Sequence, residues 1–223
     1  MTAPASKARR RRRLLGGIIF FVLGGSTAAA LSLAREPVRA AASTPGAARP
    51  AFAAARIAVP PEAARQAQAQ GVILQPIKTI LNVPERMRFG DFRWNDEGIP
   101  AGPTWVRVDL RSQILSVFRA GHEIGTAVIL YGADELATPT GKFPIRAKLK
   151  DHRSATYDAP MPYTLRLTSD GVSIHGSDVR WGYATHGCVG VPEQFAARLF
   201  DEVKAGDAVL IIDGKAPADT RRA

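Results

Sequence analysis

The chain has 223 residues, which is enough for one ordinary domain with appendages and short for two. Apolar residues make up 46% of the sequence, so we expect a hydrophobic core. The net charge is +10, but six Lys and Arg residues lie before residue 14, so the charge does not indicate a nucleic-acid-binding domain. The single cysteine, Cys188, excludes an intramolecular disulfide.

Residues 1–34 predict export from the cytoplasm. A basic run ends at Arg13, and residues 14–34 carry no charged side chain. Basic residues ahead of an apolar segment stay cytoplasmic, so the rest of the chain is translocated. The segment is long enough for a retained transmembrane anchor, and its small residues also fit a cleavable signal peptide. Both alternatives stay open, and both place the working domain outside the cytoplasmic membrane.

Residues 35–71 are predicted to be a flexible linker, because their first part is rich in Ala, Pro and Arg and shows no apolar periodicity. Within this range, residues 61–70 predict a short helix with Pro at its start. At the other end of the chain, we expect residues 214–223 to form a disordered tail.

Residues 72–103 are expected to pack on the domain as an N-terminal extension. Residues 72–83 are apolar but interrupted by a proline, which favours a strand or an extended segment. Residues 88–103 contain five Gly and Pro residues and predict an irregular loop, which Phe92 and Trp94 fix to the domain.

Residues 104–213 have the pattern of a mainly β domain. Strands are expected in the stretches WVRVDL, ILSVFRAGHEIGTAVILYG, TPTGKFPIRAKL, YTLRLTSDGVSIHG and DAVLIID. Ala120-Gly121 and residues 169–171 predict hairpin turns, and residues 192–206 predict a helix from their apolar spacing. Short strands with few helices favour a β-sandwich with one or two short helices over alternating βαβ units.

Cys188 lies in a sequence that favours a reactive thiol over a buried one. Gly187 precedes it and a predicted helix begins shortly after it, so the backbone can turn tightly and expose its N–H groups. Exposed N–H groups beside a nucleophile are what an oxyanion hole requires. A thiol is mostly protonated at neutral pH and needs a base, for which His175 and His186 are the candidates.

Four motifs follow one another in the domain: VRVDLRSQILSVFRAGHEIGTAVI, TPTGKFPI, IHGSD and THGCVGV. Together they make the sequence resemble the L,D-transpeptidases with the YkuD-type catalytic domain. The resemblance runs from Trp105 to Asp213, about half of the chain. It implies the β-sandwich fold of that catalytic domain, here preceded by the N-terminal transmembrane or signal helix.

The resemblance also implies roles for individual residues. Cys188 is the nucleophile, and His175 accepts and donates the proton while a backbone carbonyl, such as that of Gly176, orients it. His186 and the N–H groups of Gly187 and Cys188 form the oxyanion site, and Thr185 supports this loop. In the family the cysteine attacks the carbonyl before the terminal D-Ala of a peptidoglycan tetrapeptide and transfers the acyl group to an amine. No metal or organic cofactor takes part.

The sequence departs from the family pattern in two places. Many members have Arg two residues after the cysteine, where this chain has Gly190, and either Arg180 or Arg153 is a candidate to bind the substrate carboxylate instead. The segment between the catalytic histidine and the cysteine is also short, and its Trp181 and Tyr183 are candidates to line the substrate groove.

The sequence therefore predicts a periplasmic or secreted L,D-transpeptidase that forms 3–3 cross-links or related attachments. We expect a monomer that binds peptidoglycan stem peptides, attaches to the inner membrane through its N-terminal helix, and binds no nucleic acid. The same thiol resolved by water gives the first alternative, an L,D-carboxypeptidase or amide hydrolase. The second alternative is a peptidoglycan-binding module without catalysis. The acyl acceptor stays open.

Overall fold

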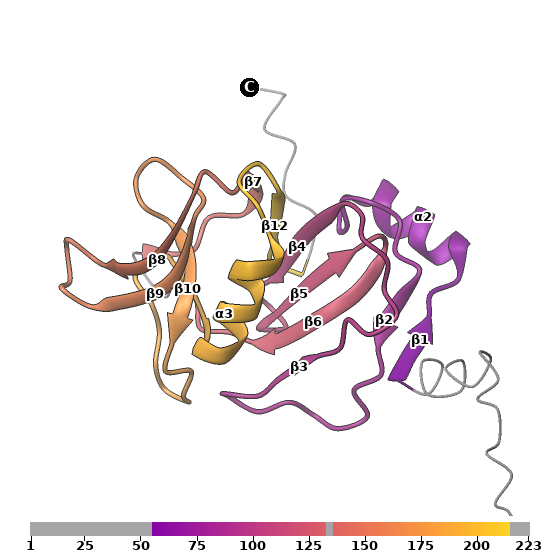
Figure 1. Cartoon of the computed structure of the whole chain (residues 1–223), viewed down its shortest axis with the longest axis horizontal. Helices are drawn as coiled ribbons and strands as arrows, with labels where there is room; N and C mark the ends of the chain where they lie inside the picture. The colour runs from indigo at the N-terminus through magenta and orange to yellow at the C-terminus, as the bar shows by residue number, and fades with distance from the viewer. Residues whose placement is uncertain (1–54, 133–135, 215–223) are drawn as a thin grey trace, which may run out of the picture. The chain divides into compact units, whose positions relative to one another are not determined.

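The computed structural model describes residues 55–132 and 136–214 (Figure 1). The predicted membrane or signal segment and nearly all of the predicted tail lie outside these residues. None of the helices in the described part of the chain is long and apolar enough to cross a membrane. The elements, in chain order, are β1 (Arg56–Ala58), α2 (Pro61–Ala69), β2 (Thr79–Leu81), β3 (Phe92–Trp94), β4 (Thr104–Asp109), β5 (Ile114–Arg119), β6 (His122–Val128), β7 (Gly141–Pro144), β8 (Ala147–Arg153), β9 (Pro160–Arg166), β10 (Ser173–Ser177), β11 (Val189–Pro192), α3 (Glu193–Glu202) and β12 (Ala208–Ile212).

The larger sheet has the strand order β1-β2-β6-β5-β4-β12-β7, and β3 pairs with β6 beside this path. β4 and β12 are parallel, as are β2 and β6, and the other pairs are antiparallel. The predicted hairpin turn between β5 and β6 is confirmed. Ala120 and Gly121 both have positive φ, 52° and 86°, the combination that suits the right-handed twist of two strands joined by a tight turn.

The smaller sheet has the strand order β11-β10-β9-β8. β9 is antiparallel to both of its neighbours, whereas β10 and β11 are parallel. Parallel neighbours need a crossover connection, which here is the short segment 178–188. Two bridges join the segment after β6 to this region, one between Leu130 and Gly190 and one between Gly132 and Thr185.

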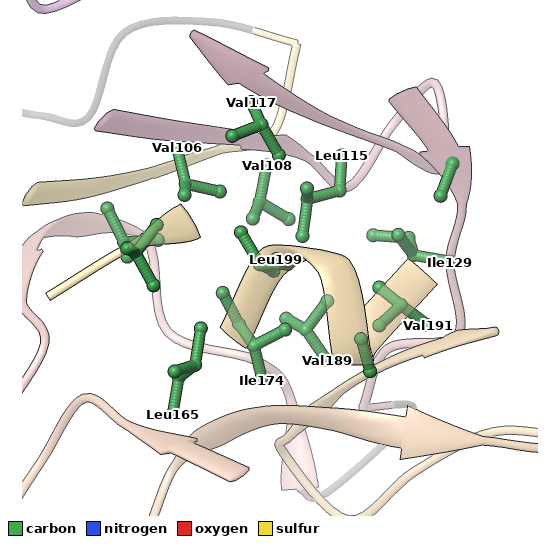
Figure 2. Packing of buried hydrophobic residues seen from close by; sticks show 14 of the residues in the cluster. Val106, Val108, Leu115, Val117, Ile129, Leu165, Ile174, Val189, Val191 and Leu199 are labelled. Carbon is green, nitrogen blue, oxygen red and sulfur yellow. The ribbon is translucent and has the colours of Figure 1, made fainter. Parts of the chain in front are cut away.

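Helix α3 packs in the core that the two sheets share. In Figure 2, Leu199 of the helix lies between Val108 of the larger sheet and Ile174 of the smaller one, and all three are buried. The helix follows the predicted pattern, since Phe195, Ala196 and Leu199 are its buried residues. The domain is mainly β with two short helices, as predicted.

The predicted irregular loop at 88–103 contains a short strand, β3, and this part of the prediction was wrong. Its residues pair with β6, and the rings of Phe92 and Trp94 meet the ring of Phe195 edge-on at centroid distances of 5.8 and 5.5 Å. The sequence gives little sign of this strand, because its three residues are held by partners far away in the chain.

The range predicted as a flexible linker includes β1 and α2, so its C-terminal part is ordered. The helix agrees with the prediction for residues 61–70. Arg56 fastens β1 to the domain, since its buried guanidinium donates to the backbone carbonyl oxygens of Glu123 and Asn95. β2 likewise gives strand structure to part of residues 72–83.

Candidate active site

Cys188 lies immediately before β11, at the end of the crossover from β10. Gly187 precedes it with φ +96°, a conformation that favours glycine and produces the tight turn expected from the sequence. The thiol is half-buried, and its sulfur lies 3.9 Å from the carbonyl oxygen of Gly171. The turn before β10 therefore forms one wall around the thiol.

His175 and Cys188 lie close together in the register of the smaller sheet. Ile174 pairs with Val189 and His175 pairs with Gly190, so Cys188, which immediately precedes β11, lies beside the start of β10. Parallel neighbours in a sheet are about 5 Å apart. The sheet therefore brings the segment that carries the thiol next to the strand that carries the imidazole.

The orientation of His175 follows from one hydrogen bond. Its Nδ1 lies 2.9 Å from the carbonyl oxygen of Gly176, as predicted from the family resemblance. A carbonyl only accepts hydrogen bonds, so Nδ1 carries the proton of the neutral imidazole and Nε2 keeps its lone pair. Nε2 is therefore the atom that can accept a proton.

Burial shifts the pKa values of His175 and Cys188 in opposite directions. It lowers the pKa of His175, and the hydrogen bond to Gly176 opposes this shift while the nearby His152 adds to it. Burial raises the pKa of the Cys188 thiol, and the carboxylate of Asp170 adds to this shift while the backbone N–H of Ser173 opposes it. Both shifts favour a thiol and a neutral imidazole over a thiolate–imidazolium pair, and with that starting pair the proton moves during attack.

Two hydroxyl groups hold the backbone of Cys188. Thr185 Oγ1 donates to the Cys188 carbonyl oxygen at 2.5 Å, and Thr138 Oγ1 lies 3.4 Å from the same oxygen. Thr138 also accepts a hydrogen bond of 2.8 Å from the N–H of Gly132. The supporting role of Thr185 stays a prediction, for which this hydrogen bond gives a structural basis. Thr138 was not among the predicted site residues, although it begins the recognised motif TPTGKFPI.

Gly132 lets the segment after β6 approach the nucleophile loop. A Cβ atom at Gly132 would lie 2.6 Å from the amide nitrogen of Gly187, closer than real atoms approach. A side chain at this position would push the two backbones apart. The bridge between Gly132 and Thr185 therefore depends on this glycine.

His186 is exposed, and its ring stacks on that of Tyr157 with a centroid distance of 4.2 Å and an angle of 18°. Tyr157 belongs to the connection between β8 and β9, which reaches the nucleophile loop in this way. The role of His186 in an oxyanion site stays a prediction.

The candidate substrate-binding residues of the crossover segment point into solvent. Arg180 is exposed and pairs with Asp178, with 2.7 Å between Nε and Oδ1. Trp181 is 81% exposed and Tyr183 is 63% exposed. The other candidate for the absent arginine, Arg153, forms a 3.0 Å ion pair with Asp158 in the connection between β8 and β9.

Gly190, where the family resemblance leads us to expect arginine, is buried between β10 and the segment after β6. A Cβ atom there would lie 3.0 Å from Cβ of Ser177 and 3.5 Å from Cβ of Leu130. The first distance is tighter than ordinary packing, so a side chain at residue 190 would require Ser177, on the strand that carries His175, to give by a few tenths of an ångström.

Comparison with known proteins gives one family. Residues 103–211 match the model of the L,D-transpeptidase catalytic domain (YkuD). The chain is similar to a solved L,D-transpeptidase from Stackebrandtia nassauensis, at 26% identity and a TM-score of 0.47, covering 53% of this chain and 58% of that one. It is also similar to a mutant L,D-transpeptidase from Enterococcus faecium, at 26% identity and a TM-score of 0.46, covering 50% of each chain. The chain thus spans little more than half the length of these proteins. No curated protein sequence matches it.

Proposed function

We propose, from the premise that residues 103–211 belong to the L,D-transpeptidase catalytic domain family (YkuD), that the chain is a cysteine-dependent L,D-transpeptidase. The family acts on peptidoglycan stem peptides. The observation that carries the proposal is that Cys188, just before β11, lies beside the strand of His175, whose Nδ1 is bound to a carbonyl so that Nε2 is left as the base.

The first half of the reaction forms an acyl-enzyme. The Sγ proton of Cys188 passes to Nε2 of His175 as the sulfur bonds to the carbonyl carbon of the third stem residue. The tetrahedral intermediate then breaks its C–N bond to D-Ala, and the leaving nitrogen takes the proton from Nε2. The product is a thioester on Cys188 and a free D-Ala.

The second half transfers the acyl group. An acceptor amine gives a proton to Nε2 of His175 and bonds to the thioester carbon, the C–S bond breaks, and the sulfur of Cys188 takes the proton back. The N–H groups of Gly187 and Cys188 are proposed to stabilise the oxyanion in both halves. Because Thr185 and Thr138 fix the Cys188 carbonyl, this backbone is held in one orientation before substrate binds.

The N-terminal segment is proposed to place the domain in the cell envelope, either as a retained inner-membrane anchor or after signal cleavage. A stem peptide on another strand is the proposed acceptor, giving a 3–3 cross-link, and the protein is proposed to act as a monomer.

Intact-mass measurement after incubation with a disaccharide-tetrapeptide tests the proposal. We expect the chain to gain the mass of the donor less D-Ala, and Cys188→Ala to gain nothing. The products should include a cross-linked dimer. Free tripeptide without dimer would leave only the L,D-carboxypeptidase alternative, and the absence of both adduct and turnover would leave the binding module.

A further inference from the structure

A cavity of about 620 Å³ lies where β10 and β11 end, beside the first turn of α3. Its volume is in the range of small-ligand sites. The side chains in its wall that matter for recognition are two aromatic and four polar ones: Phe92, Tyr163, Ser177, Asp178, Glu193 and Gln194. Within the described ranges, neither Glu193 nor Gln194 is engaged by an ion pair or a side-chain hydrogen bond, so their polar atoms are available to a ligand.

The cavity lies within reach of the active site. Ser177 is two residues beyond His175 on β10, and Pro192, which also lines the cavity, ends the strand that follows Cys188. Four residues of strand span about 13 Å. A stem peptide that places its third carbonyl at the thiol extends about 10 Å toward its first residue. A stem peptide that runs along β11 toward α3 would therefore bring its attachment point near the cavity.

Trp181 borders the cavity. Its ring meets that of Phe89 edge-on at 5.6 Å, and Phe89 precedes Gly90, which lines the cavity. On its own segment, Trp181 closely follows Asp178, another lining residue. The indole of Trp181 is 81% exposed, so its face is accessible to a ligand.

We propose that this cavity and Trp181 bind a sugar ring of the glycan strand that carries the donor stem peptide. The proposal rests on the function proposed above. An indole face packs against the C–H face of a pyranose ring, while carboxylate and amide groups such as Glu193 and Gln194 bind its hydroxyl groups. The site makes the polymer a better donor than a free tetrapeptide.

Calorimetric titration of the full-length Cys188→Ala protein with a peptide-free oligomer of β-1,4-linked N-acetylglucosamine tests the site without catalysis. We expect saturable binding that Trp181→Ala and Glu193→Ala each weaken at least fivefold, and that Trp181→Tyr largely restores. Asp201→Ala, an exposed carboxylate on the same helix outside the cavity, is the matched control and should bind as the parent does. Because the sugar is uncharged, the affinity of the protein for the oligomer should be nearly the same at 50 and 500 mM salt.

The ratio of KM for free tetrapeptide to KM for disaccharide-tetrapeptide gives the second readout. It should exceed fivefold in the wild-type chain and fall toward one in Trp181→Ala. The inference is overturned if the oligomer does not bind, if Trp181→Ala binds it unchanged, if binding depends steeply on salt as for a cationic ligand, or if the KM ratio is the same in both proteins. Failure of the proposed function looks different, because then neither substrate acylates Cys188.

Discussion

The Nδ1 atom of His175 lies 2.9 Å from the carbonyl oxygen of Gly176, the next residue on the same strand. Because Nδ1 donates this bond, Nε2 acts as the base, and burial keeps the pKa of the imidazole below its ordinary value of about 6.5. The base form thus persists at pH values where an exposed histidine is half protonated.

This relationship predicts the acid limb of acylation. A lowered pKa means that His175 gains its proton only at lower pH, so the rate of acyl-enzyme formation should stay level through pH 6.5 and decline below it. Rapid-quench mass spectrometry from pH 4.5 to 8 measures this rate. A midpoint above pH 6.5 contradicts the assignment. In His175→Ala the limb should disappear and the rate should fall by about 10² to 10⁴.

The thiol of Cys188 should react slowly with alkylating agents at neutral pH. Its raised pKa leaves little thiolate, so the rate of reaction with iodoacetamide should still be rising beyond pH 8.5, about where an ordinary thiol is half ionised. A plateau already reached at pH 7 would indicate a stable thiolate–imidazolium pair instead. Cys188→Ala, which lacks the only cysteine, reports the background.

Removing the hydroxyl of Thr185 should impair catalysis more than folding. Thr185→Val deletes the 2.5 Å bond to the Cys188 carbonyl, which contributes about 1 kcal/mol to stability. With the nucleophile loop less fixed, we expect kcat/KM to fall about tenfold, equal to about 1.4 kcal/mol. Thr185→Ser keeps the hydroxyl and should retain most activity. A loss in Thr185→Ser as large as that in Thr185→Val would contradict the prediction, because serine keeps the hydroxyl and lacks only the methyl group.

Gly187→Ala should weaken both the fold and the reaction. An L-residue at φ +96° costs about 1–3 kcal/mol, and relief of this strain rotates the peptide groups next to Cys188. Denaturant unfolding and acylation kinetics measure the two effects. Gly206→Ala, at φ +92° with open space around its Cβ position in the turn between α3 and β12, is a matched control for backbone strain. It should show a similar loss of stability and leave acylation unchanged.

The ion pair of Arg119 and Glu202 should account for part of the stability. Arg119 NH1 lies 2.7 Å from Glu202 Oε2, and the side chains are 17% and 12% exposed, so β5 is tied to the end of α3. Glu202→Ala leaves the Arg119 guanidinium with its longer 3.5 Å pair to Asp96 and should lower the free energy of unfolding by about 1 to 3 kcal/mol. Glu97→Ala, an exposed carboxylate, should have almost no effect. A loss below about 1 kcal/mol would show that water replaces the carboxylate.

The sequence predicted those parts of the site that depend on residues close together in the chain. Gly187 and Cys188 form a local turn, and the hydrogen bond from His175 reaches only the next residue. The contacts that were not predicted join distant segments. Thr138 reaches the Cys188 carbonyl across 50 residues, and Tyr157 stacks on His186 from another hairpin. The spacing of residue types along the chain does not predict such contacts, because they depend on how the two sheets pack together.

The fold shows the same division. Alternation and turn residues predicted the hairpin at Ala120-Gly121, and apolar spacing predicted α3. β3 was not predicted, because three residues are too few to show the alternation of apolar and polar side chains that indicates a strand. Its position is set by β6 and by Phe195, which lies about a hundred residues later.

Gly190 couples the strand that follows the nucleophile to the strand that carries the imidazole. A Cβ atom at residue 190 would lie 3.0 Å from Cβ of Ser177, so a side chain there requires Ser177 to give by a few tenths of an ångström. Substitutions at the two positions are therefore expected not to be additive. A side chain at residue 190 should be tolerated better when residue 177 is glycine than when it is serine.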